Sequence, residues 1–292
     1  MGALKAAIFL VICLALAACV WLLWQSPPVP PRPAPRTDPV APAVAKSPPV
    51  ELPSKPVEPT VPQAPENPEA VQQLAQRFTG RPASSLLCRV TEADREAILR
   101  QYQQDRPLAD KRGLAWALGY AGGEAAVPVL IGALTRDYGQ QALSLDDEAA
   151  LLEHLLALGF LAQTSDAAYA FLKQGVEPEF WKKTRTWTST RGAAADKLAV
   201  HFCLQGVGLS DRPDAEECLE GFRKKEQAYL YTFGSSMAQA KFHLDTIRSR
   251  GRDFLRQNYS VPGDQSLFEA WAAGEGKDWV EWANACSRVP QK

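Results

Sequence analysis

The sequence predicts an all-α fold, a short α-solenoid of helical hairpins that follows an N-terminal membrane helix and a disordered proline-rich linker. From residue 69 onward, apolar residues recur at intervals of three and four, in segments separated by Gly, Pro, Ser and Asp. A glycine-centred unit recurs along this region, and no stretch alternates with the period of two that is typical of a strand. We therefore expect three parts, an anchor or signal segment at 1–25, a linker at 26–68 and a helical domain at 69–292.

The N-terminal segment 6–24, AAIFLVICLALAACVWLLW, has no charged residue and is nearly long enough to cross a hydrocarbon core. Cleavage after Ala17 and lipidation at Cys19 are alternatives, because Ala15-Leu16-Ala17 has a small-x-small pattern and residues 16–19 resemble a bacterial lipobox. The run stays apolar beyond Cys19, whereas a processed product normally begins with polar residues. We therefore expect a retained single-pass anchor in the cell membrane, with the folded domain facing the periplasm or the exterior.

The next segment is dominated by proline, with sixteen of the twenty-three prolines of the chain between Pro27 and Pro68. Such a segment has too little apolar bulk to fold and too much proline for a helix or a β-ladder. In the polyproline II conformation it would reach about 130 Å, at about 3.1 Å per residue. We expect an extended spacer that holds the domain away from the bilayer.

The helical domain is predicted from units centred on Gly119, Gly159 and Gly206, which recur after 40 and then 47 residues. In each unit an apolar helix is expected to end at the glycine, which suits a left-handed C-cap, and a second amphipathic helix follows. The second helices are expected at 125–134, 166–175 and 214–222, with Pro128 in the first turn of its helix. Each unit is therefore predicted to be a helical hairpin.

Helix starts and the C-terminal elements follow from the same rules. Thr91 and Ser144 each stand three residues before a carboxylate, which predicts a cap at the start of a helix. Longer helices are expected over 223–233 and 235–259, followed by shorter ones at 266–274 and 277–288. The last tryptophans of the chain are expected to cover the end of the core rather than bind a ligand, and these are Trp271, Trp279 and Trp282.

The first unit, RGLAWALGYAGGEAAVPVLIGAL at residues 112–134, resembles HEAT-like repeats of the type also found in phycobilin lyases. The arginine, the ALG, the glycine turn and the AVPVLIGAL helix are all in register, whereas the later units match loosely and the resemblance extends over 107–222. It implies an α-solenoid that scaffolds partners. The repeat consensus describes packing positions, so it assigns no catalytic residue and gives no indication of a bilin lyase.

One segment departs from what a solenoid requires, PEFWKKTRTWTSTRG at residues 178–192, between the second and third units. It could be an exposed loop that offers stacking faces and cations to a carbohydrate or an acidic partner, or its tryptophans could pack on the solenoid. The candidate partner-binding residues are Trp181, Lys182, Lys183, Arg185 and Trp187.

The cysteines and histidines give little support to a metal or catalytic site. Outside the cytoplasm Cys203 and Cys218 would be the preferred disulfide, because they fall on successive predicted helices; four buried thiols are the alternative. His154 and His201 occupy equivalent repeat positions, five residues before their glycines, which better fits a packing position than a ligand. No metal, no cofactor and no catalytic residue is expected.

The expected function is therefore that of a non-catalytic, membrane-anchored scaffold or adaptor for another protein of the cell envelope. The formal net charge of −1 provides no global positive field, so nucleic acid is not expected as a partner. The alternatives are an envelope polysaccharide-binding module, which the 178–192 segment would support, and an all-α enzyme without a recognisable motif.

Overall fold

The computed structural model describes residues 65–224, 234–259 and 265–287. The chain divides into two units, Met1–Gln63 and Ala64–Lys292, and only the second contains described residues. The predicted anchor at 6–24, including Cys19, and nearly all of the linker therefore lie outside the described residues. None of the described helices is long and apolar enough to cross a bilayer.

The described part is all-helical, as predicted, and its sole β-pairing is an isolated bridge between Leu143 and Ser189. It contains fourteen α-helices and one 3-10 turn, η1 (Glu92–Asp94). The helices are α2 (Pro68–Leu74), α3 (Ser84–Leu87), α4 (Arg95–Gln103), α5 (Leu108–Ala121), α6 (Ala126–Thr135), α7 (Leu145–Leu161), α8 (Asp166–Gly175), α9 (Pro178–Thr184), α10 (Ala194–Leu209), α11 (Ala215–Arg223), α13 (Gly234–Arg250), α14 (Arg252–Asn258), α15 (Gln265–Ala273) and α16 (Lys277–Ser287).

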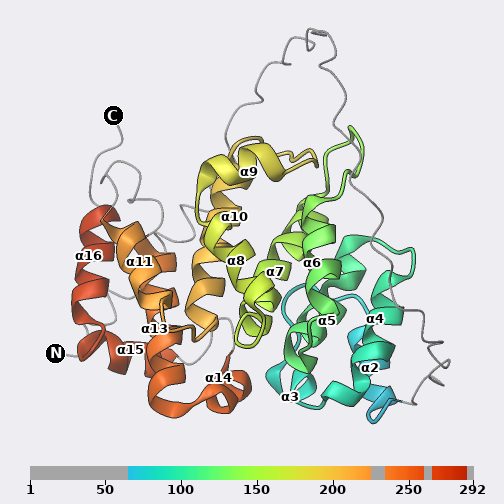
Figure 1. Cartoon of the computed structure of the whole chain (residues 1–292), viewed down its shortest axis with the longest axis horizontal. Coiled ribbons are helices and arrows are strands. Elements are labelled where there is room, and N and C mark those ends of the chain that lie inside the picture. The colour runs from blue at the N-terminus through green and yellow to red at the C-terminus, as the bar shows by residue number, and fades with distance from the viewer. Residues whose placement is uncertain (1–64, 225–233, 260–264, 288–292) are drawn as a thin grey trace, which may run out of the picture. The chain divides into compact units, whose positions relative to one another are not determined.

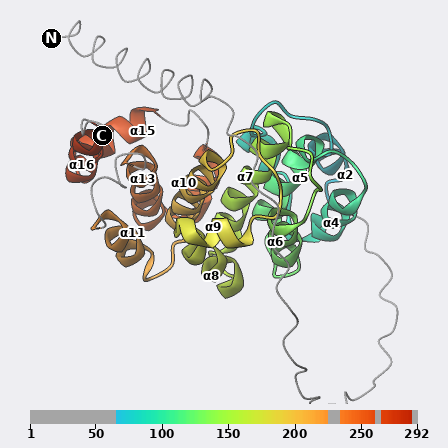
Figure 2. The same cartoon turned by 90° about the horizontal axis from the view of Figure 1, so that it is seen from above.

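The long helices form a series in which each contacts the next, in the order α5, α7, α10, α13 and α16 (Figure 1). The shorter helices α6, α8 and α11 each pack on two successive long helices, the one before and the one after, and lie along one side of the series (Figure 2). Because the inner helices have neighbours on several sides, their apolar residues surround the helix axis instead of forming one stripe. In α5, all residues but Asp110 and Lys111 are buried.

Close approach between neighbouring long helices depends on glycine. A Cβ atom at Gly159 of α7 would lie 2.8 Å from Cα of Gly206 on α10, a separation that real Cβ atoms do not show. Gly119 faces the backbone of Ala157 in the same way. The prediction that these three glycines are C-caps is therefore wrong: they lie inside their helices and permit helix contact, and Gly122, with φ of 75°, is the residue that ends α5.

The predicted helix starts are confirmed. Thr91 and Asp94 form a reciprocal capping box at η1, immediately before α4. Oγ of Ser144 accepts a hydrogen bond from the backbone N–H of Asp147 at 3.1 Å, which caps α7. Pro128 lies in the first turn of α6, where a missing N–H costs no intrahelical hydrogen bond.

The helix expected over 223–233 lies almost entirely outside the described residues, and the described C-terminal helices differ in one respect from the prediction. The helix expected over 235–259 is interrupted at Gly251, whose φ of 90° is a left-handed conformation that L-residues rarely adopt, and it becomes α13 and α14. The core role expected for Trp271 and Trp279 is confirmed, since their exposed fractions are 9% and 3%, and Trp282 packs against the same core.

The break at Gly251 directs α14 toward the beginning of the domain, where it contacts α3. The hydroxyl of Ser84 donates to the carbonyl oxygen of Tyr259 at 2.8 Å, and that of Tyr120 donates to the carbonyl oxygen of Arg256 at 2.9 Å. The guanidinium of Arg81 lies 4.4 Å from the centroid of the Tyr259 ring. Residues far apart in the sequence thus join α14 to α3 and α5.

The close helix contact predicts opposite outcomes for the same substitution at two helical glycines. Gly159→Ala should destabilise the domain by about 1–3 kcal/mol, because α7 and α10 must separate. Gly221→Ala, on the exposed side of α11 with open space around it, should stabilise by up to about 1 kcal/mol through helix propensity. Urea unfolding followed by circular dichroism measures both, and equal effects would contradict the packing role of Gly159.

Candidate functional site

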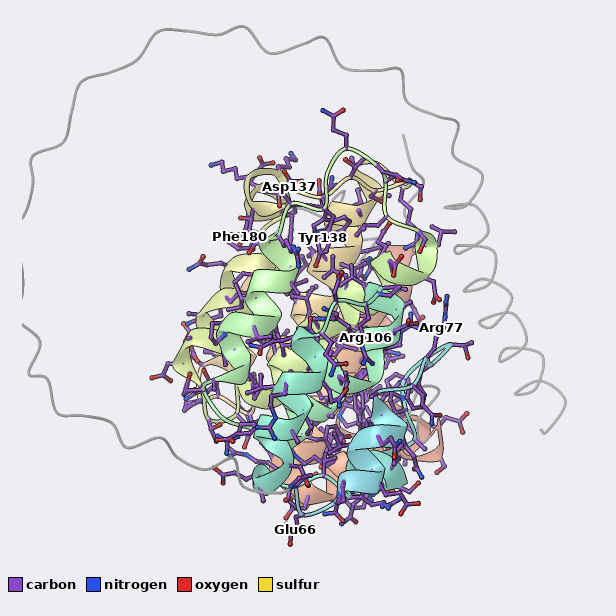
Figure 3. All side chains as sticks on the ribbon, turned by 90° about the vertical axis from the view of Figure 1, so that its right-hand side faces the viewer. Glu66, Arg77, Arg106, Asp137, Tyr138 and Phe180 are labelled. Atoms are coloured by element: carbon purple, nitrogen blue, oxygen red, sulfur yellow. The ribbon has the colours of Figure 1, made fainter. Side chains whose placement is uncertain are left out.

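A cavity of about 450 Å³ opens between the α4–α5 loop, α5, α6 and the α6–α7 loop. We call it the cationic pocket, because three of its lining residues are Arg106, Lys111 and Arg136. Figure 3 labels two of the lining residues, Arg106 and Tyr138. Tyr102 and Tyr138 contribute aromatic rings to its wall, and Leu108 contributes apolar surface.

Each of the three cations is held in place by the fold. Arg106 donates from Nη1 to the carbonyl oxygen of Ala75 at 2.9 Å. Nζ of Lys111, on α5, lies 5.1 Å from the centroid of the Tyr102 ring, and the guanidinium of Arg136 lies 5.6 Å from that of Tyr138. Within the described part of the chain, neither Lys111 nor Arg136 forms an ion pair with a carboxylate.

The two acids of the pocket do not neutralise these cations. Both oxygens of Asp147 are engaged, because Oδ1 accepts from the backbone N–H of Ala109 at 2.8 Å and Oδ2 accepts from the Ser144 hydroxyl at 2.7 Å. Asp105 is exposed to solvent, which weakens its effect, and it raises the pKa of Lys111 without forming an ion pair with it. With three cations and two carboxylates, the pocket keeps an excess of positive charge.

The environment of Lys111 shifts its protonation equilibrium. Partial burial lowers the pKa of the Lys111 ammonium, and the nearby charge of Arg136 lowers it further. An anion bound beside Lys111 would oppose both effects. The pocket is thus suited to an anionic group, which would stabilise the charged form of this lysine.

Tyr102 of the pocket wall forms a buried hydrogen bond with His154, which lies behind it. Nδ1 of His154 is 2.7 Å from the carbonyl oxygen of Ala150 and must donate its proton there, so Nε2 accepts from the Tyr102 hydroxyl at 2.5 Å. Burial lowers the pKa of His154 to about 4. This histidine is neutral and fully engaged, and it joins α4 to α7, as its predicted packing role requires.

The segment 178–192 is not an exposed platform. Trp181 and Trp187 have exposed fractions of 0% and 2%, and each indole N–H donates to a backbone carbonyl oxygen, that of Gly175 for Trp181 and that of Leu134 for Trp187. Of the two alternatives for this segment, the structure has the one in which the tryptophans pack on the helices, because both rings are buried beside α6, α8 and α10. The Leu134 carbonyl also belongs to the last turn of α6, so Trp187 satisfies a helix end.

The three basic residues of this segment that were predicted to bind a partner differ in their contacts. Arg185 forms an ion pair with Asp196, in which Nε lies 2.6 Å from Oδ1, and its guanidinium lies over the Trp187 ring. Lys182 and Lys183 lie exposed on α9. Partner binding through these two lysines stays a prediction.

The structure holds Cys203 and Cys218 as thiols, so the predicted disulfide is not formed in it. Cys203 is fully buried on α10, with Sγ packed against Gly175 of α8, and burial raises the pKa of its thiol. Among the described residues no group of three His, Cys, Asp or Glu side chains could hold a metal ion. Nδ1 of His201 lies 2.6 Å from the Ser236 hydroxyl, on the neighbouring helix α13.

A second polar cluster is internal to the fold. Arg112 is 2% exposed and donates a hydrogen bond to the carbonyl oxygen of Phe78 at 2.7 Å. Its Nε lies 3.4 Å from the carboxylate of Glu153, which also accepts a hydrogen bond from the Trp116 indole N–H at 2.8 Å. Burial raises the pKa of Glu153, and the hydrogen bond from Trp116 opposes that shift. This cluster joins α5, α7 and the segment after α2, and its charges are balanced within it.

Sequence reasoning missed the cationic pocket because its cations come from two separate short stretches, DRPLADK at 105–111 and TRDYG at 135–139. Neither stretch matches a known site pattern. Both stretches flank the hairpin predicted at 112–134, but this signal is too weak to predict that their basic side chains line one cavity. No protein-family model, curated protein or solved structure matched this chain.

The neutral state of His154 predicts a pH dependence of stability. Its folded-state pKa of about 4 lies below the ordinary value of 6.5, so the unfolded chain binds the proton more tightly and stability falls as pH drops from about 6.5 toward 4. Between pH 7 and pH 5 this one group should account for a loss of about 2 kcal/mol.

Urea unfolding of wild type and His154→Gln at the two pH values isolates this contribution. Glutamine can accept from Tyr102 and donate to Ala150 without titrating in this range. The variant should lose less stability than wild type on acidification. Parallel losses in both proteins would show that His154 does not titrate differently on folding.

The burial of Cys203 predicts selective labelling. In the native protein iodoacetamide should modify the exposed Cys88 and leave Cys203 unmodified, because Cys203 is inaccessible and its thiolate is disfavoured. After denaturation both should react, which peptide mass spectrometry measures. A Cys203 that resists labelling even after denaturation, and becomes reactive only on reduction, would instead indicate a disulfide.

Proposed function

We propose that this protein is a non-catalytic scaffold or adaptor, anchored in the cell membrane through residues 6–24, whose helical unit is a short HEAT-like α-solenoid that binds another protein of the cell envelope. The observation that carries the proposal is the series of five long helices with shorter helices along one side. A stacked helical array is rigid, so little conformational entropy is lost when a partner binds to it.

The distribution of reactive side chains is consistent with binding rather than catalysis. His154 is engaged by Tyr102 and Ala150, His201 contacts Ser236, and the Cys203 thiol is buried. The polysaccharide alternative has lost its main support, because it required exposed faces on Trp181 and Trp187. The cationic pocket gathers three cations that form no ion pair with a carboxylate in the described part of the chain.

Affinity purification of the full-length protein from its own solubilised membranes, followed by quantitative mass spectrometry, tests the proposal. The control carries residues 1–64 fused to an unrelated soluble domain. We expect an envelope protein to co-purify in near-stoichiometric amount with the full chain and not with the control, and then to bind the purified protein in isothermal titration calorimetry. A companion that stays with the control, or the absence of any protein companion, would refute a scaffold role of the helical unit.

A further inference from the structure

We propose that the cationic pocket binds a carboxylate-bearing peptide segment of the partner, with an acidic side chain against Lys111, Arg106 and Arg136 and an adjacent apolar side chain on the wall that Leu108 contributes. This inference rests on the proposed scaffold function and specifies what its surface recognises. It concerns a short segment, because a cavity of about 450 Å³ accommodates a few side chains and not a folded surface.

Charge pairing in the rest of the domain provides a comparison for this pocket. Several buried and half-buried arginines are paired with carboxylates, as in Arg112 with Glu153, Arg185 with Asp196 and Arg191 with Glu148. Arg81 and Arg256 have no such pair within the described residues, and each lies over an aromatic ring. Lys111 is half-buried on α5 without such a partner in the described part of the chain. A charge that is partly removed from water and unpaired is best stabilised by an anion supplied from outside.

The composition of the wall favours a peptide over other anions. Apolar surface from Leu108, Val129 and Leu143 lies beside the cations, which suits a segment that mixes acidic and apolar residues. Phosphate sites commonly use free N–H groups at a helix N-terminus. At the start of α5 the N–H of Ala109 is already bound by Asp147, so this N–H is not free to bind a phosphate.

Nucleic acid and sugar fit less well. Three cations around one cavity do not form the basic stripe that follows a nucleic-acid backbone, and the chain has a net charge of −1. The Tyr102 and Tyr138 rings each carry a cation over one face, so a stacked sugar ring would compete for that surface. A carboxylate would instead add to the contacts that these cations already make.

The test uses the full-length protein in detergent micelles and two acetylated, amidated tetrapeptides, Leu-Glu-Glu-Leu and Leu-Gln-Gln-Leu, with binding measured by isothermal titration calorimetry. We expect the acidic peptide to bind at least about tenfold more tightly than the amide peptide, and more weakly as salt increases. Lys111→Met, which keeps the aliphatic stem, should weaken binding of the acidic peptide by about tenfold. Arg136→Gln, at an exposed position that folding does not require, should weaken it in the same direction.

Lys197→Met is the matched control, because Lys197 is an exposed lysine on α10 outside the pocket. The affinity of this variant for the acidic peptide should equal that of wild type. The proposal is overturned if Lys197→Met weakens binding as much as Lys111→Met, if both peptides bind equally, or if inorganic phosphate displaces the acidic peptide at comparable concentration. Capture of an envelope partner without binding of the acidic peptide would refute this inference alone, whereas peptide binding without any partner would refute the scaffold function.

Discussion

The distance of closest approach between neighbouring long helices is the constraint on which the rest of the domain depends. Where α7 crosses α10, two glycines face each other, so the backbones meet without intervening side chains. Glycine lowers helix stability by about 1 kcal/mol at each such position. The close contact offsets that cost by extending the packed surface along both helices, so that α5, α7 and α10 are buried almost all around.

Close packing also removes polar side chains from water, and each must then find a partner. Arg112 meets Glu153 and the Phe78 carbonyl, and His154 meets Tyr102 and the Ala150 carbonyl. The segment 178–192 has a related role, because Trp187 satisfies the end of α6. These contacts join elements that are distant in the sequence, and they make helices that are only weakly specified individually into one cooperative unit.

The cationic pocket is the exception to this internal balance. It lies where two loops and the ends of α5 and α6 meet without closing over one another. Asp147 is used to cap α5, so it is not available to neutralise Lys111. Three cations around one open cavity, none of them in an ion pair within the described residues, have the electrostatic character of a binding surface, which is why we propose partner recognition there.

The sequence by itself determined the all-α class, the helix starts at Thr91 and Ser144, and the second helices of the three hairpins, because these follow from local periodicity and capping chemistry. It also located the three repeated glycines, but their role was decided by tertiary structure: a glycine at a C-cap and a glycine at a helix crossing look alike until the neighbouring helix is known. The same holds for Trp181 and Trp187, whose burial depends on α6 and α8, and for Lys111 and Arg136. Lys111 and Arg136 come to line the same cavity only because of how two loops fold around one hairpin, and no local sequence pattern encodes that arrangement.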